Sequence, residues 1–119
     1  LRGGPGRGSR AWHPRRVKLS VIVITKNEEA MLARCLQSVR FADEIVVVDS
    51  GSTDRTVDIA RECGARVVVT EDWPGFGPQK NRALDLAGGE WVLSLDADEW
   101  VEPPLADELR ACIASSGGP

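Results

Sequence analysis

The sequence has no long apolar segment and few cysteines, and each absence excludes a class of protein. All its apolar runs stay well below the roughly 18 residues of a membrane-spanning helix, so no such helix is expected. Its three cysteines are far apart and form no C-x-x-C pair, which argues against a disulfide framework or a metal cluster. We expect them to be small buried residues in a reducing cytosol. The composition, 42% hydrophobic and 28% charged over 119 residues, is that of one globular domain.

Positive charge is concentrated at the start of the chain. Residues 1–18 hold six of the fifteen lysines and arginines and no acid, whereas all eighteen acids lie in residues 19–119. The opening segment is rich in Gly, Pro and Arg and lacks the apolar core of a signal peptide. We expect residues 1–18, including the only histidine, His13, to form a disordered basic tail without a catalytic role. The protein is then expected to be cytoplasmic, with at most a peripheral contact to the inner face of the cytoplasmic membrane and no nucleic-acid partner.

Four short runs rich in Val, Ile and Leu have the pattern of parallel strands that are buried on both faces. These runs are residues 19–25, 44–50, 66–70 and 91–96. Segments with helical spacing follow them, at residues 27–41, 52–64, 77–89 and from 103 onward. Asn27 is expected to cap the first helix and Gly64 to end the second. The alternation predicts an α/β fold over residues 19–119, with a mostly parallel sheet and flanking helices.

Polar segments follow the ends of all four strands, at residues 25–29, 49–54, 71–80 and 96–99. Because connections between parallel strands are right-handed, these loops meet at the carboxyl edge of the sheet, where open α/β sheets bind ligands. Asp96 and Asp98 come directly after a buried strand, and their oxygens suit Mg²⁺ or Mn²⁺ whose shell phosphate and water complete. Asp49 ends an earlier strand in the same way. The sequence therefore predicts a metal-assisted ligand site here, with Asp49 among its ligand-binding residues.

Three other parts of these loops allow two interpretations each. Thr25 and the turn of residues 27–29 can contact a ligand or cap the following helix. Trp73 and Phe76 can form a flap over the site or pack back onto the sheet. Lys80 lies early in a predicted helix, where a positive charge is unfavourable against the helix dipole. This position favours an anionic partner for Lys80.

Four segments together resemble a known family. LSVIVITKNEE, ADEIVVVDSGSTDRTVDIA, WPGFGPQKNRAL and WVLSLDADE look like the nucleotide-sugar-binding half of a family 2 glycosyltransferase with the Rossmann-like GT-A fold. They are most similar to the subgroup of lipopolysaccharide core β-1,4-glucosyltransferases. The resemblance covers residues 18–103 with four motifs in order, so it is far more specific than D-x-D alone. It implies a bacterial cell-envelope enzyme that transfers a sugar, expected to be glucose, from a UDP-sugar to a glycan, lipid-linked glycan or lipopolysaccharide-core acceptor.

The resemblance also implies which residues recognise the nucleoside. Thr25 and Asp49 would line the uracil end of the UDP-sugar. The turn of Asn27, Glu28 and Glu29 would lie beside them. A substitution at this end should weaken UDP and UDP-sugar alike.

The same resemblance assigns the metal and the diphosphate to the other loops. Asp98 would hold the Mg²⁺ or Mn²⁺ ion that bridges the diphosphate, and Asp96 would contact the ribose or a metal-bound water. Lys80 and Asn81 would lie toward the sugar phosphate. With the metal as a Lewis acid for the leaving UDP, an acceptor hydroxyl would displace it directly, with inversion.

The family pattern continues beyond the printed sequence. Inverting displacement needs a carboxylate base on the acceptor side, and the family carries this base and the acceptor-binding half well downstream of D-x-D. This sequence ends one helix after that motif. We therefore expect an N-terminal half whose catalytic base is unknown, whose sheet flank next to residues 91–99 is exposed, and whose activity is incomplete.

Two alternatives from other classes stay open. One is a non-catalytic fragment or pseudoenzyme that binds a nucleotide-sugar. The other is a receiver-like signalling domain, which is also an α/β unit with an acidic pocket. That domain needs an acceptor Asp at the end of its third strand and a fifth strand, whereas here the third strand ends in VVVTED and no fifth strand is predicted.

Overall fold

A single five-stranded sheet forms the centre of the computed structural model, which describes residues 2–3 and 17–116. The strand order is β1-β5-β2-β3-β4. Four of these strands are parallel: β2 (Leu19–Thr25), β3 (Glu44–Asp49), β4 (Arg66–Val69) and β5 (Trp91–Asp96). The predicted parallel sheet is thereby confirmed, and the predicted bounds of β2 and β5 match those of the structure.

The strand β1 (Arg2–Gly3) was not predicted. It pairs antiparallel with β5, with Arg2 opposite Val92 and Gly3 opposite Trp91. These two residues lie within the segment predicted to be a disordered tail, and they pair with backbone groups of the β5 edge that would otherwise be unpaired there. Most of the predicted tail, including His13, lies outside the described residues.

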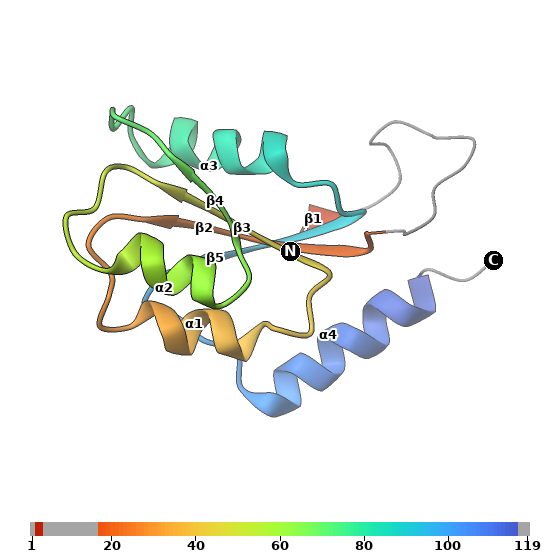
Figure 1. Ribbon diagram of the computed structural model, residues 1–119. Coiled ribbons are helices and arrows are strands. Elements are labelled where there is room, and N and C mark those ends of the chain that lie inside the picture. The colour runs from red at the N-terminus through yellow and green to blue at the C-terminus, as the bar shows by residue number, and fades with distance from the viewer. Residues whose placement is uncertain (1, 4–16, 117–119) are drawn as a thin grey trace.

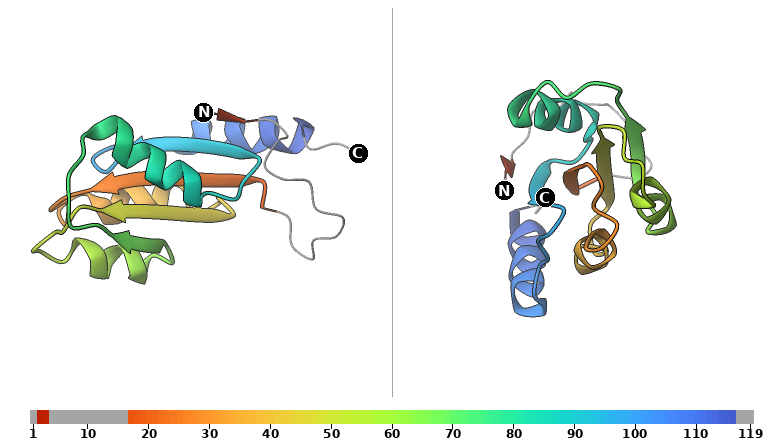
Figure 2. Two further views of the ribbon diagram at one scale, coloured as in Figure 1. Left: turned by 90° about the horizontal axis from the view of Figure 1, so that it is seen from above. Right: turned by 90° about the vertical axis from the view of Figure 1, so that its left-hand side faces the viewer.

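Four helices cover the two faces of the sheet, as the alternation predicted. They are α1 (Leu32–Ser38), α2 (Thr56–Glu62), α3 (Phe76–Leu86) and α4 (Pro103–Ser116). Figure 1 shows α3 on one face and α1, α2 and α4 on the other, and the views in Figure 2 agree. None of the helices within residues 17–116 combines the length and the apolar character that a bilayer-spanning segment requires.

Successive strand residues point to opposite faces, so each face has its own apolar layer. On the face of α1, α2 and α4, the buried side chains include Val21, Val23, Val47, Leu32 and Leu36. On the face of α3 they are Ile22, Val46, Val48, Ala83 and Ala87. The Val-rich and Ile-rich runs therefore pack on both sides, as expected of parallel strands.

The first helix begins later than predicted. Asn27 has a φ of 54° and is not the cap; Met31 occupies the N-cap position of α1. The backbone of this turn is used elsewhere, because the Asn27 N–H donates to Ser52 Oγ at 2.7 Å. The acidic residues Glu28 and Glu29 consequently lie before α1 and not in its first turn.

The end of the second helix agrees with the prediction. Gly64 follows α2 with a φ of 85°, in the left-handed region that glycine tolerates best. Its N–H donates to the carbonyl of Arg61 at 3.0 Å, and the N–H of Ala65 donates to that of Ala60 at 3.0 Å. These two bonds form a Schellman motif, which turns the chain into β4.

A glycine sets the approach of β5 to β2. Gly89 is buried, and its N–H donates to Ser20 Oγ at 2.9 Å. A Cβ at this position would lie 2.6 Å from Ser20 Oγ and 2.7 Å from Ser20 N, which real Cβ atoms do not tolerate.

The cysteines differ from one another: Cys35 is buried as expected, Cys63 is partly buried, and Cys112 is exposed on α4, contrary to prediction.

Candidate functional site

A cleft of about 630 Å³ opens at the carboxyl edge of the sheet, where the sequence predicted the site. This volume falls within the range of about 300–1,000 Å³ typical of small-molecule sites. Residues from the ends of β2, β3 and β5 and from the loop before α3 line it: Ile24, Thr25, Lys26, Glu28, Ser50, Trp73, Phe76, Asp96, Ala97 and Asp98. The lining joins carboxylates, a lysine, hydroxyls and two aromatic rings.

The structure brings together only part of the predicted site. Thr25, Glu28, Asp96 and Asp98 line the cleft. The other predicted residues lie outside its lining: Asn27, Glu29, Asp49, Lys80 and Asn81. Four residues of the lining were not predicted: Ile24, Lys26, Ser50 and Ala97. The two polar ones, Lys26 and Ser50, directly follow the predicted residues Thr25 and Asp49.

Asp49 lies behind the cleft wall with its side chain fully buried. Its Oδ1 accepts hydrogen bonds from Thr25 Oγ at 2.6 Å and from Ser52 Oγ at 2.5 Å. Its Oδ2 accepts from the N–H groups of Gly51 at 2.9 Å and Ser52 at 2.7 Å. The carboxylate thus holds the end of β2 and the loop after β3 together, and Ser50 faces the cleft in its place.

These donors also control the charge of Asp49. Burial by itself raises the pKa of a carboxyl group, because it disfavours the ionised form. The hydrogen bonds from Ser52, Thr25 and Gly51 outweigh burial and leave the pKa of Asp49 below its ordinary value. Asp49 is therefore a buried anion at neutral pH, with four donors that compensate its charge.

The loops after β2 and β3 are joined by further hydrogen bonds. Asn27 Oδ1 accepts from the N–H of Thr53 at 2.8 Å, while the N–H of Glu28 donates to Thr56 Oγ at 2.8 Å. The N–H of Thr56 donates in turn to Asp54 Oδ1 at 2.9 Å. The turn of residues 27–29 is thus held against residues 52–56, and this places Glu28 in the cleft lining.

The acidic side of the cleft is formed by Asp96 and Asp98, both of which are exposed. The turn between them is fixed by Glu99: the N–H of Asp96 donates to Glu99 Oε1 at 2.8 Å, and the Asp96 carbonyl accepts from the N–H of Glu99 at 2.9 Å. Burial and the charges of Asp98, Asp54 and Asp96 raise the pKa of Glu28, so these carboxylates share one negative field.

Such a field suits a divalent cation. Within residues 17–116, no three His, Cys, Asp or Glu side chains are grouped closely enough to hold a metal by themselves. Mg²⁺ and Mn²⁺ sites often use only one or two carboxylates and complete their shell with water and phosphate oxygens. Asp96 and Asp98 fit that requirement.

Two lysines bring positive charge to the acidic side. Lys26 lines the cleft, and its Nζ donates to the carbonyl of Gly51 at 2.8 Å. Lys80 Nζ on α3 lies 4.0 Å from Asp96 Oδ1, with both side chains partly exposed. The carboxyl edge thus presents cations and anions side by side, an arrangement that suits a phosphate group and a metal ion together.

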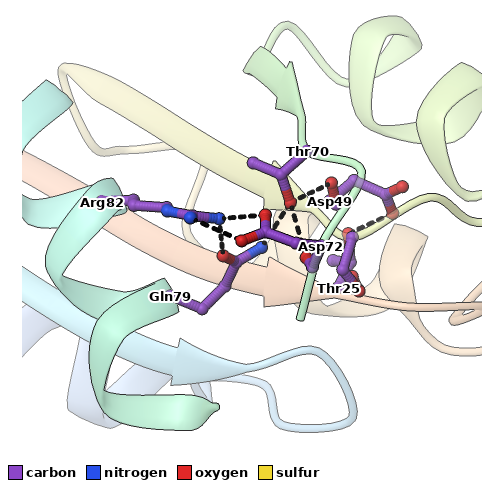
Figure 3. A network of polar contacts seen from close by, with 7 residues as sticks. Thr25, Asp49, Thr70, Asp72, Gln79 and Arg82 are labelled. Carbon is purple, nitrogen blue, oxygen red and sulfur yellow. Dashed lines mark hydrogen bonds and ion pairs between the residues drawn. The ribbon is translucent and has the colours of Figure 1, made fainter. Parts of the chain in front are cut away.

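The loop between β4 and α3 is fastened to the sheet and to the helix, as Figure 3 shows. Arg82 on α3 donates to both oxygens of Asp72, at 2.7 and 2.9 Å, and to Gln79 Oε1 at 2.9 Å. Gln79 is fully buried and donates to Thr70 Oγ at 3.0 Å. The Thr70 N–H donates to the carbonyl of Asp49 at 2.7 Å. Arg82 therefore serves this loop and does not face the cleft.

Comparison with known sequences decides the family. The sequence model described as "Glycosyl transferase family 2" matches residues 20–113, which include every residue of the cleft lining. The chain belongs to glycosyltransferase family 2. The receiver-like alternative is thereby set aside, and the predicted GT-A nucleotide-sugar-binding fold is confirmed.

The chain has curated relatives in bacteria. An uncharacterized glycosyltransferase of Rickettsia typhi is 46% identical over 99 residues, which are 82% of this chain and 34% of that protein. The lipopolysaccharide core biosynthesis glycosyltransferase LpsC of Rhizobium meliloti is 36% identical over 105 residues, which are 85% of this chain and 39% of that protein. The chain thus spans about a third of the length of such relatives.

Solved structures of similar proteins contain nucleotides. TarS 1-349 of S. aureus in complex with UDP has a TM-score of 0.68 and 34% identity, and the match covers 82% of this chain and 32% of that one. The mannosyltransferase PcManGT of Pyrobaculum calidifontis, in complex with GDP-Man and Mn²⁺, has a TM-score of 0.70 and 30% identity, covering 89% of this chain and 34% of that one. Both therefore share the fold of this chain over the matched part.

Proposed function

We propose that the cleft binds a UDP-sugar together with Mg²⁺ or Mn²⁺, as the donor half of an inverting glycosyltransferase. The observation that carries this proposal is the pairing of Asp96 and Asp98 with Lys26 around one cleft of suitable volume. Carboxylates alone would repel a diphosphate, so a cation between them is required for binding. The UDP in the TarS structure and the GDP-Man and Mn²⁺ in the PcManGT structure support it.

In this proposal, Asp98 and Asp96 hold the cation, which supplies Lewis-acid stabilisation of the leaving diphosphate when bound. Lys80, next to Asp96, contributes a further positive charge on the phosphate side, with Asn81 beside it in the sequence. Thr25, Ser50 and the turn of residues 27–29 form the nucleoside end. Asp49 positions this end from behind the wall, because its carboxylate already accepts four hydrogen bonds.

The acceptor and the sugar belong to the same proposal. The similarity to LpsC supports a lipopolysaccharide-core acceptor, and we expect UDP-glucose as donor. The acids that follow Asp98 are Glu99, Glu102, Asp107 and Glu108, and none lines the cleft. Glu99 accepts from the Asp96 N–H and Glu102 from Trp100 Nε1. The proposal therefore assigns the catalytic base to none of them.

The experiment is a calorimetric titration of the 119-residue chain with UDP, in Mn²⁺ and in EDTA. Because the ion screens both the carboxylates and the diphosphate, Mn²⁺ is expected to raise the affinity at least about tenfold. Asp98→Asn should abolish this gain. Asp107→Asn removes the same charge from an exposed position on α4 outside the cleft and should keep it. Equal affinity for UDP in EDTA and in Mn²⁺ would contradict the metal site.

Transfer requires a second measurement. Transfer of glucose from UDP-glucose to a lipopolysaccharide-core acceptor should be assayed with the same chain. Metal-dependent UDP binding without any transfer supports a donor-binding part that does not catalyse by itself. GDP titrated in parallel is expected to bind more weakly than UDP; equal or tighter binding of GDP would contradict the uracil assignment.

A further inference from the structure

Two aromatic side chains stand at the mouth of the cleft with much of their surface exposed. Trp73 is 49% exposed and Phe76 is 70% exposed, although both belong to the cleft lining. Their ring centroids lie 5.0 Å apart with the planes at 89°, an edge-to-face pair. Exposed apolar surface that is gathered in a cleft, and not scattered, indicates contact with a ligand.

The pair is held in place without a ligand. Asp72, directly before Trp73, is bound by the two Arg82 donors, and the buried Gln79 joins Arg82 to Thr70 on the other side (Figure 3). The segment that carries the rings is thus fastened before Trp73 and after Phe76. A surface held in place in this way binds at a reduced ordering cost.

The rings are also placed next to the charged groups of the cleft. Phe76 and Lys80 are four residues apart on α3 and therefore lie on the same helix face. Lys80 Nζ is 4.0 Å from Asp96 Oδ1. By contrast, Thr25 and Ser50 of the lining are only 4% and 9% exposed. If the phosphates bind near Asp96 and Lys80, as the proposed function has it, the sugar beyond them would lie next to the exposed aromatic pair and not next to the buried hydroxyls.

We propose that Trp73 and Phe76 form a platform for the hexopyranose ring of the donor, an inference that rests on the proposed UDP-sugar function. A pyranose ring carries several C–H bonds on one face, and this apolar face packs on an aromatic ring while the hydroxyls stay in water. The platform thus contributes to the affinity for the sugar and not for the nucleotide. Asp72 and Arg82 are positioning residues that act through it.

The test compares UDP with UDP-glucose, in Mn²⁺, by calorimetry on the 119-residue chain. Trp73→Ala is expected to lower the affinity for UDP-glucose relative to UDP by about threefold to tenfold, the range of an aromatic contact. Phe76→Ala should act in the same direction, and Trp73→Phe should retain most of the wild-type ratio. Trp100→Ala is the matched control, because Trp100 packs under Arg34 outside the lining.

The outcomes separate the platform from other roles of the rings. Equal losses for UDP and UDP-glucose would show that the rings stack on the base, and unchanged affinities for both would show that they bind no donor group; either result overturns the proposal. Phe76→Leu tests whether a loss of affinity comes from misfolding, because it removes the ring but keeps an apolar side chain at a mostly exposed position. A wild-type chain that binds no UDP in Mn²⁺ would overturn the proposed function itself.

Discussion

Asp49 is a fully buried carboxylate that accepts four hydrogen bonds, so its replacement should lower the stability of the fold. The replacement Asp49→Ala removes an acceptor for two hydroxyls and two backbone N–H groups, from Thr25, Ser52 and Gly51. Hydroxyls can rotate to other partners, but the two N–H groups cannot. A fully buried donor without an acceptor costs about 1–3 kcal/mol. The N–H groups of Gly51 and Ser52 are only partly buried, so each should cost about 1–2 kcal/mol, and we expect a loss of about 2–4 kcal/mol in the free energy of unfolding.

Such a loss is large for a chain of this size. Small domains are stable by about 5–15 kcal/mol in total, and the melting temperature should fall by roughly 10–20 °C. Asp49→Asn should cost less, because its amide oxygen can face the Gly51 and Ser52 N–H groups while its NH₂ group faces the two hydroxyls. Asp107→Ala on α4 is the control. Urea unfolding followed by tryptophan fluorescence measures all three variants.

The same carboxylate predicts a dependence of stability on pH. The pKa of Asp49 is lowered in the folded chain, so its stabilisation is present above its ordinary pKa and is lost as the pH falls through the folded value. When the pH is lowered below about 4, the urea concentration at the unfolding midpoint should therefore decrease for the wild-type chain, and it should decrease less for Asp49→Asn.

Nucleotide binding distinguishes a direct from an indirect role of Asp49. If Asp49 acts from behind the wall, Asp49→Ala should lose UDP affinity together with stability, and Asp49→Asn should keep most of both. If Asp49 instead contacts the base, Asp49→Asn should lose UDP affinity at unchanged stability. An Asp49→Ala chain with the wild-type unfolding midpoint would refute the argument from the four donors.

Two further predictions concern packing. Burial, together with nearby acidic groups led by Glu99, raises the pKa of the Cys35 thiol to about 12. At pH 8, iodoacetamide should therefore label the exposed Cys112 first and Cys35 only after unfolding, which mass spectrometry can show. Rapid labelling of native Cys35 would contradict its burial. Gly89→Ala should lower the free energy of unfolding by about 1–3 kcal/mol in urea titrations, because its Cβ overlaps Ser20. Gly77→Ala, with open space around it, should be neutral or stabilising, and equal midpoints for the two variants would contradict the close approach.

Strands and their order along the chain could be predicted because they depend on a local signal. Residues 19–25 and 91–96 are strands with the bounds that their apolar runs indicated. The helix starts depended on distant residues. Asn27 has the composition of a cap, yet its N–H donates to Ser52 from the next loop, and the backbone adopts a positive φ there. No pattern within residues 27–41 reveals that bond.

The site shows the same division. The carboxyl edge could be predicted from topology, which places Thr25, Asp96 and Asp98 together. The side chain orientation at Asp49 and Ser50 could not, because both follow the same apolar run and only the donors around Asp49 decide which of them turns inward. Trp73 and Phe76 were open between a flap and core packing, and the structure shows them exposed in the lining.

The two sides of the cleft are stabilised in different ways, and this difference affects how the cleft would bind UDP and a metal ion. The loops after β2 and β3 satisfy each other's hydrogen-bonding groups. Asp49 accepts from four donors, Asn27 Oδ1 accepts from the N–H of Thr53, and the N–H of Glu28 donates to Thr56 Oγ. The carboxylates of Asp96 and Asp98 remain exposed, while the turn between them is held by the side chain and the backbone of Glu99. On the proposed function, the folded chain keeps its nucleoside end preformed, whereas the charges of Asp96 and Asp98 at the other end are only partly balanced by Lys26 and Lys80. A bound Mg²⁺ or Mn²⁺ ion should relieve the remaining repulsion, so we expect the affinity for UDP to depend on the metal and the stability of the fold not to depend on it.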